Sequence, residues 1–263
     1  MVLPSFMICG QWSSFLIVCL SCYTLKFIEF FYFFMLRLLS LADMIIYNLQ
    51  KGWEHLWKIS WYPYVLHYFI ISASVTITLN FRPLYYHDIS SLKIEETSGF
   101  SKKVIRENYD ALIDYNQFFY SGKLKLTLPM SREGRIHFEE VKRIFVGIEC
   151  LCVITLILSC FLIKRKIRSR NIDFLKSASI ITVLLPVTVG ILCAVNWDVA
   201  FTMFHEIMFR NDYWIFDEAT DPVIMILPDA FFLHCAVMII LLILIGSLLC
   251  MGFRSFFRHR FML

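Results

Sequence analysis

The chain has 263 residues, a formal net charge of +4, 59% hydrophobic residues and only 17% charged ones, with a mean hydropathy of +0.66. This composition excludes an ordinary soluble domain, because the apolar residues occur in blocks of about 20, the length that spans a bilayer. No soluble segment carries a basic patch interleaved with aromatic residues, which argues against a nucleic-acid partner. The nine cysteines all lie in or beside apolar blocks, so neither a disulfide framework nor a zinc site of paired cysteines is expected. We predict an all-α polytopic membrane protein.

Residues 1–60 form an apolar N-terminal extension that fits three interpretations. The stretch from 13 to 39 is rich in phenylalanine but contains Lys26, Glu29 and Arg37. It lacks the short apolar core and the small-residue cleavage site of a secretory signal peptide. The extension could be a fifth spanning helix, a helix lying in the membrane interface, or the product of an upstream start codon, with Met44 as the true start.

Four apolar segments beyond residue 60 are each long enough to cross a bilayer. They cover about residues 61–81, 144–163, 177–197 and 223–253. The first begins with Trp61, Tyr62 and Tyr64, an aromatic belt of the kind found at membrane interfaces. The fourth is longer than a bilayer requires, so we expect it to begin within a structure at the membrane surface. The spans define a transmembrane domain, residues 61–253, followed by a basic tail, residues 254–263.

The connector between the second and third spans sets the orientation. Residues 164–170 read KRKIRSR, and short basic connectors of membrane proteins face the cytoplasm. The tail, which is also basic, then lies on the same side. The two remaining connectors, residues 82–143 and 198–222, are therefore expected to be outer loops on the extracytoplasmic side, where a loop-and-helix cap would form.

The first outer segment is too polar to enter lipid and contains its own structural signals. Apolar residues recur at helical spacing over residues 102–119, which predicts an amphipathic helix. Leu124, Leu126 and Leu128 then alternate with polar residues, a pattern typical of a short strand or an extended segment that ends at Pro129. From Arg135 onward the chain can form one continuous helix with the second span.

Two histidine-containing segments lie at the membrane boundaries. His137 precedes the second span and His205 follows the third. Two crossings separate them, and an even number of crossings returns the chain to the side it left. Both histidines should therefore face one membrane surface, where they could form one site. Because histidine titrates near neutral pH, such a pair could take up and return a proton in one catalytic cycle. Each could equally be an amphipathic residue tolerated at the interface.

The familiar metal and nucleophile motifs are incomplete or absent. His205-Glu206 matches the first half of the zinc-protease motif His-Glu-x-x-His, but the fifth position is Phe209, so the second ligand is missing. There is no Gly-x-Ser-x-Gly motif, and the polar segment holds no cysteine. We therefore expect no metal and no cofactor.

Several polar residues around the second histidine could support a reaction. Arg210 and Asn211 could donate hydrogen bonds to an oxyanion or to a substrate carbonyl. Trp214 could belong either to the site or to an interfacial aromatic belt. Asp229 and Glu149 are ionisable residues in or near the spans, where such groups usually line a polar cavity or lie close to the surface.

The sequence resembles a known family over about residues 61–253. The residues that carry the resemblance are Asn108–Tyr115 (NYDALIDY), His137–Lys142 (HFEEVK), Phe204–Trp214 (FHEIMFRNDYW), Asp221–Ile224 (DPVI) and Leu227–Pro228. In order, spacing and placement beside spans, they are similar to the lipoprotein intramolecular transacylases of Gram-positive bacteria, the Lit family. Residues 1–60 have no counterpart in that family, which favours the upstream-start interpretation.

The resemblance implies a reaction and a set of site residues. The substrate would be a diacylglyceryl lipoprotein anchored in the outer leaflet of the cell membrane. Its sn-2 acyl chain would move to the α-amino group of its N-terminal cysteine, giving a lyso-form lipoprotein. His137 and His205 would be catalytic, with Asn211, Trp214 and Tyr115 as supporting residues. Because the substrate amine is the nucleophile, the absence of a serine or cysteine nucleophile fits this reaction.

Two other classes of function remain open from the sequence. The chain could be a non-catalytic membrane protein that serves in transport or assembly, or a membrane-embedded hydrolase of lipids or peptides. The resemblance does not decide which histidine is the base, the acyl-chain or lipoprotein specificity, or the oligomeric state.

Overall fold

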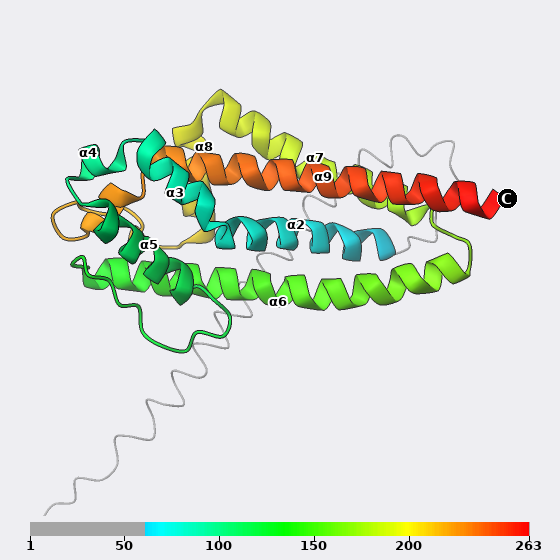
Figure 1. The fold of residues 1–263 in the computed structure, drawn as a ribbon, viewed down its shortest axis with the longest axis horizontal. Coiled ribbons are helices and arrows are strands. Elements are labelled where there is room, and N and C mark those ends of the chain that lie inside the picture. Colours follow the sequence, from blue (N-terminus) through cyan, green and yellow to red (C-terminus); the bar gives the residue numbers. More distant parts are fainter. Residues whose placement is uncertain (1–60, 263) are drawn as a thin grey trace, which may run out of the picture. The chain divides into compact units, whose positions relative to one another are not determined.

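The computed structural model describes residues 61–262, so the three interpretations of residues 1–60 lie outside the described range. Within it every regular element is a helix (Figure 1). In chain order the elements are α2 (Tyr62–Asn80), α3 (Arg82–Ser91), α4 (Ile94–Ser98), α5 (Lys102–Tyr115), α6 (Arg132–Arg168), α7 (Phe174–Val195), α8 (Trp197–Met208), the 3-10 helix η1 (Pro222–Ile226) and α9 (Asp229–Met262).

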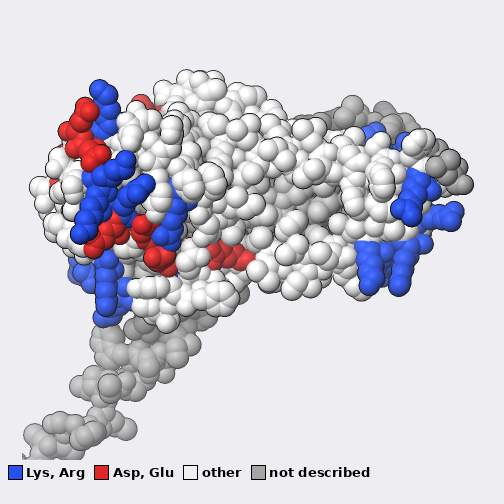
Figure 2. Space-filling view, viewed as in Figure 1, with Lys and Arg blue, Asp and Glu red and all other residues white. Residues whose placement is uncertain are grey.

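Four of these helices, α2, α6, α7 and α9, are long and apolar enough to cross a membrane. The predicted all-α architecture with four spanning helices is therefore confirmed for residues 61–262. α2 packs against α6, α7 and α9, and α7 packs against α9. On the face drawn in Figure 2, the middle of the four-helix region is almost without charged side chains, whereas Lys and Arg gather at the end that holds the C-terminus. This distribution suits a bilayer around the middle of the helices.

Small residues bring α7 and α9 close together. Ser179 Oγ donates to the Ser247 carbonyl at 3.1 Å, and Ser247 Oγ donates to the Ser179 carbonyl at 3.0 Å. Small and hydroxyl-bearing residues are the usual contacts between spanning helices, because lipid offers helices no hydrophobic reason to associate. α2 is joined to α7 in a similar way, since His67 Nδ1 lies 3.3 Å from Thr182 Oγ1.

The polar segment after α2 builds a cap with a hydrophobic core of its own. Tyr85 of α3 stacks on Tyr109 of α5 with ring centroids 3.7 Å apart, and Phe231 of α9 meets both rings edge-on. The Tyr85 hydroxyl donates to the Ile226 carbonyl at 2.6 Å, which joins the cap to η1. Other buried members of this core are Ile89, Ile94, Ile105, Leu112, Ile113 and Val223.

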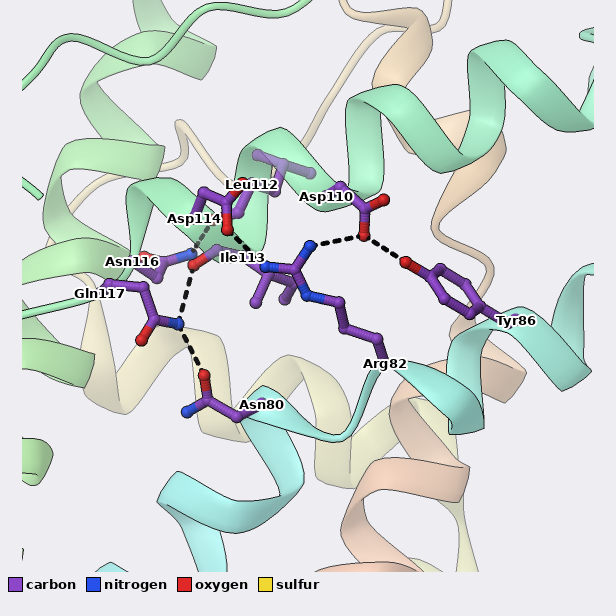
Figure 3. Close-up of polar contacts among 9 residues, drawn as sticks. All are labelled: Asn80, Arg82, Tyr86, Asp110, Leu112, Ile113, Asp114, Asn116 and Gln117. Carbon is purple, nitrogen blue, oxygen red and sulfur yellow. Dashed lines mark hydrogen bonds and ion pairs between the residues drawn. The ribbon is translucent and has the colours of Figure 1, made fainter.

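A polar network ties α5 to the junction between α2 and α3 (Figure 3). Arg82 Nη1 donates to Asp110 at 2.9 Å, and Arg82 Nη2 pairs with Asp114. The Tyr86 hydroxyl also donates to Asp110, at 2.7 Å. Each partly exposed ion pair contributes little by itself, about 0–1 kcal/mol. Together these contacts hold α5 and the rest of the cap in position at the end of α2.

The structure refines the prediction for the first outer segment. α5 ends at Tyr115, one turn before the expected end at residue 119. The segment from 121 to 131 is irregular, with bends at residues 122, 127 and 128, and it pairs with no strand among residues 61–262. The side-chain oxygen of Asn108 instead accepts hydrogen bonds from Thr127 N at 2.9 Å and Leu128 N at 3.2 Å. A buried asparagine on α5 thus takes the place of a neighbouring strand.

α6 is one continuous helix of 37 residues, as expected for the stretch that joins His137 to the second span. It begins at an N-cap, where Ser131 Oγ accepts from Gly134 N at 2.9 Å. Its first three turns, residues 132–143, are polar and lie before the apolar stretch at 144–163.

The second outer segment, expected to be a loop from residue 198 to 222, begins with a helix, α8. Asn196 separates α7 from α8, because its backbone is extended and its side-chain oxygen accepts from Val199 N at 3.0 Å. The chain therefore turns at a helix cap that the sequence analysis placed inside the third span. α8 carries His205 in its last turn.

Candidate active site

The first site residue, His137, is held in place by the anchored start of α6. Ser131 N donates to Asp221 Oδ1 at 2.8 Å, which ties the helix N-terminus to the segment before η1. Gly134 lies so close to Asp221 that an added Cβ would meet Oδ1 at 2.3 Å. The absence of a side chain at Gly134 therefore permits the contact that positions His137, three residues later on α6.

His137 is buried, with 6% of its surface exposed, and lies in an aromatic setting. Its ring centroid is 4.7 Å from that of Phe209 and 5.4 Å from that of Phe216. Nδ1 is buried without a hydrogen-bond partner among the described residues. Burial, with a smaller contribution from the charge of His205, lowers the pKa of His137 to about 4. The ring is therefore neutral at physiological pH and can act as a hydrogen-bond donor from one nitrogen.

The second site residue, His205, has a defined tautomer. Its Nδ1 lies 2.8 Å from the carbonyl oxygen of Phe201, one turn earlier in α8. A carbonyl can only accept, so Nδ1 carries the hydrogen and Nε2 of the neutral ring has a free lone pair. Burial lowers the pKa of His205, and this effect is opposed by the hydrogen bond to Phe201 and by the nearby carboxylate of Asp229. His205 is thus neutral at neutral pH, with a basic nitrogen available.

The tertiary fold brings the two histidines together. Their ring centroids are 6.3 Å apart, and Phe209 contacts both rings. The two rings therefore line one small site.

Trp214 and Asn211 both lie at this pair, in different ways. The Trp214 ring stacks on His205 with centroids 4.7 Å apart. Asn211 Nδ2 donates to both oxygens of Glu140, at 3.1 and 3.2 Å, and its Oδ1 accepts from Tyr213 N at 3.0 Å. Asn211 thus ties the segment after α8 to α6, one turn from His137. Because its side-chain amide is hydrogen-bonded to Glu140, Asn211 holds the segment after α8, which includes Trp214, against α6.

Among residues 61–262, neither Arg210 nor Tyr115 has a hydrogen bond or a ring contact with His137 or His205. The Arg210 side chain is exposed. Tyr115 is buried, and among the described residues its ring meets Tyr120 at 5.9 Å and the Lys142 ammonium at 4.3 Å. Tyr115 therefore supports the loop after α5 and has no ring contact with His137 or His205.

Sequence reasoning missed the aromatic enclosure of the pair and the role of Glu140. Phe201 lies one turn before His205 on the same helix, and this spacing by itself predicts that the two side chains are neighbours. Glu140 lies three residues after His137, at a spacing that places two side chains on one helical face. Phe216 comes from an irregular segment, so only the tertiary structure could place it against His137.

The comparisons with known proteins point to one family. The family model for "Lipoprotein intramolecular transacylase Lit" matches residues 60–232. The solved structure of the membrane-integral lipoprotein intramolecular transacylase Lit from Bacillus cereus is 36% identical, with a TM-score of 0.74, over 76% of this chain and 93% of that one. Two structures of the same protein, with a histidine replaced by arginine or by alanine, have TM-scores of 0.69 and identities of 36% over 76% of this chain, and cover 89% and 91% of theirs. No curated protein matches the chain.

Proposed function

The chain belongs to the lipoprotein intramolecular transacylase family and is a multi-pass membrane acyltransferase, and on this basis we propose how its reaction proceeds and on which side of the membrane it takes place. The substrate is a diacylglyceryl lipoprotein. The sn-2 acyl chain moves from its glycerol oxygen to the α-amino group of its N-terminal cysteine, and the product is a lyso-form lipoprotein.

The observation that carries this proposal is the pair of unequal histidines. His205 has a fixed tautomer with Nε2 free, which suits a general base. His137 is more deeply buried, stays neutral, and can donate one N–H to a carbonyl oxygen. A neutral histidine with a lowered pKa is a known way to polarise a carbonyl without supplying a charge. Acyl transfer to an amine needs both roles and needs no protein nucleophile.

In the proposed course, the substrate amine attacks the ester carbonyl while His205 Nε2 takes a proton from the amine nitrogen. A C–N bond forms, and the carbonyl oxygen becomes an oxyanion that accepts a hydrogen bond from His137. The intermediate then collapses as the bond between the carbonyl carbon and the glycerol oxygen breaks. His205 returns its proton to that oxygen, so the enzyme ends in its starting state.

The surroundings of the pair favour a substrate that arrives from lipid. α8 exposes apolar side chains on its surface, Val199, Met203, Phe204 and Ile207 among them, while its last turn carries His205. The basic connector between α6 and α7 lies at the other end of both helices, and such connectors face the cytoplasm. We therefore place the site at the extracytoplasmic surface, the side on which the lipoprotein is anchored.

The decisive experiment is mass spectrometry of a synthetic diacylated lipopeptide incubated with the purified protein. We expect a product of unchanged mass whose fragments carry an acyl group on the amine. His205→Ala should abolish it, and His87→Ala, which changes an exposed histidine of α3 outside the site, should not.

Two outcomes contradict the proposal. Loss of one acyl chain from the peptide, with release of a fatty acid, would show hydrolysis, and a chelator would then tell whether a metal is required. Full activity of His205→Ala would show that this ring is not the base.

A further inference from the structure

The loop between α5 and α6 exposes two adjacent aromatic side chains. Phe119 has 91% of its surface exposed and Phe118 has 50%. Their rings contact each other edge-to-face, with centroids 4.9 Å apart. A pair of large apolar side chains at a loop tip is unfavourable in water. Nothing in the chemistry proposed above uses these two residues.

The loop that carries this pair is fastened to α6 at two points. Lys142 Nζ donates to the Tyr120 carbonyl at 2.6 Å, and it lies over the rings of Tyr115 and Tyr120 at 4.3 and 4.9 Å. Two turns further along α6, about 10 Å in rise, Glu149 Oε2 accepts from Phe118 N at 2.8 Å. The loop therefore lies alongside α6, as Figure 1 also shows.

The contact between Phe118 and Glu149 places the aromatic pair at the membrane boundary. Glu149 lies within the apolar stretch of α6, residues 144–163. From Val153 onward this helix exposes apolar side chains, including Ile154 and Ile157. A carboxylate near lipid is costly unless a partner satisfies it, and the Phe118 amide is such a partner. The exposed aromatic pair is therefore continuous with the lipid-facing surface of α6.

We propose that Phe118 and Phe119 insert among the acyl chains of the leaflet on the histidine side, as an anchor that holds the cap against the membrane. Lys123 and Lys125, which follow in the same loop, are exposed and suited to the phosphate groups of that leaflet. The combination of aromatic and basic residues is typical of segments that lie in a membrane interface. The anchor is a lipid contact of the cap and is separate from acyl transfer.

The test uses a photo-crosslinking residue in the full-length protein, reconstituted in nanodiscs of phosphatidylglycerol and phosphatidylethanolamine. p-Benzoylphenylalanine replaces Phe119 in one variant. A second variant carries it at Ile157, in the lipid-facing part of α6, as the positive control. A third carries it at Glu96, on the exposed surface of α4, as the negative control. After irradiation, mass spectrometry detects phospholipid adducts on the protein.

We expect phospholipid adducts at positions 119 and 157 in similar yield, and at least ten times fewer at position 96. Adding Glu149→Ala, which removes the acceptor of the Phe118 amide, or Lys142→Met to the position 119 variant should reduce its adducts without changing those at position 157. The proposal is wrong if position 119 gives no lipid adduct while position 157 does. It is also wrong if position 119 cross-links mainly to a second copy of the chain, or if positions 119 and 96 label equally.

Discussion

His205 Nδ1 lies 2.8 Å from the carbonyl oxygen of Phe201, whereas Nδ1 of His137 is buried without a partner among residues 61–262. The first ring has its tautomer assigned by the helix that carries it, and its free nitrogen can accept a proton. The second ring is neutral and retains its N–H for donation. Two residues of one type thus have different environments, and this difference should be visible in the effects of substitutions and in the pH dependence.

Glutamine substitutions should separate the roles of the two histidines. His205→Gln should be as inactive as His205→Ala, a loss of about 10²–10⁴-fold in turnover, because an amide cannot take up the amine proton. His137→Ala should lose about 10²–10³-fold, the usual effect of removing an oxyanion donor. His137→Gln should retain more activity than His137→Ala, because its amide can still donate. Initial rates of N-acylation should be measured for all four variants. If His205→Gln retained activity and His137→Gln did not, the assigned roles of the two histidines would be exchanged.

The pH dependence of kcat/KM should show the lowered pKa of His205. The substrate α-amino group, with a pKa of about 7.7–8.0, must be neutral to attack, so the logarithm of the rate should fall with unit slope below that pH. A histidine of ordinary pKa, about 6.5, would steepen the slope to two below pH 6.5. Because burial lowers the pKa of His205, the basic form persists at lower pH and the second break should lie below 6.5. A second break at or above pH 6.5, in addition to that of the substrate amine, would contradict this environment.

The bond between Asn211 and Glu140 should act on catalysis through the position of the segment after α8. Asn211→Ala and Glu140→Ala are each expected to lower kcat by roughly tenfold, because a small displacement of reacting groups has this scale of effect. The double variant should be no worse than either single one, since both remove the same contact. Glu139→Ala, at an exposed neighbour of Glu140, is the control. Additive losses would indicate independent roles.

Gly134 should be intolerant of a side chain, unlike Gly147 on the same helix. A Cβ at Gly134 would lie 2.3 Å from Asp221 Oδ1, whereas one at Gly147 would meet nothing within 4 Å. We expect Gly134→Ala to destabilise the protein by about 1–3 kcal/mol, the usual cost of overpacking. Gly147→Ala should be neutral or stabilising by up to about 1 kcal/mol, because alanine favours a helix. Thermal unfolding in detergent compares the two, and equal midpoints would contradict the close contact.

Much of the architecture followed from patterns that are local in sequence. Long apolar blocks determine spanning helices, because lipid leaves a backbone no other way to satisfy its hydrogen bonds. The basic connector at residues 164–170 predicts an orientation, and counting crossings predicts that His137 and His205 share one side. The continuous helix that joins His137 to the second span was also predicted correctly, because its pattern is local in sequence. The cap at Asn196 was missed, since one polar residue within an apolar block is a weak signal, and α8 was taken for a loop.

The tertiary structure alone decided what each histidine can do. Hydropathy and periodicity describe how one segment meets water or lipid, and they contain no information on which distant segments touch. The 6.3 Å separation of the rings, the Phe216 contact with His137 and the bond from Asn211 to Glu140 all join residues from different elements. The lowered pKa values arise from burial by these neighbours. The sequence therefore determined the spans and the candidate pair, and only packing between α6, α8 and the segment after it made the two rings unequal.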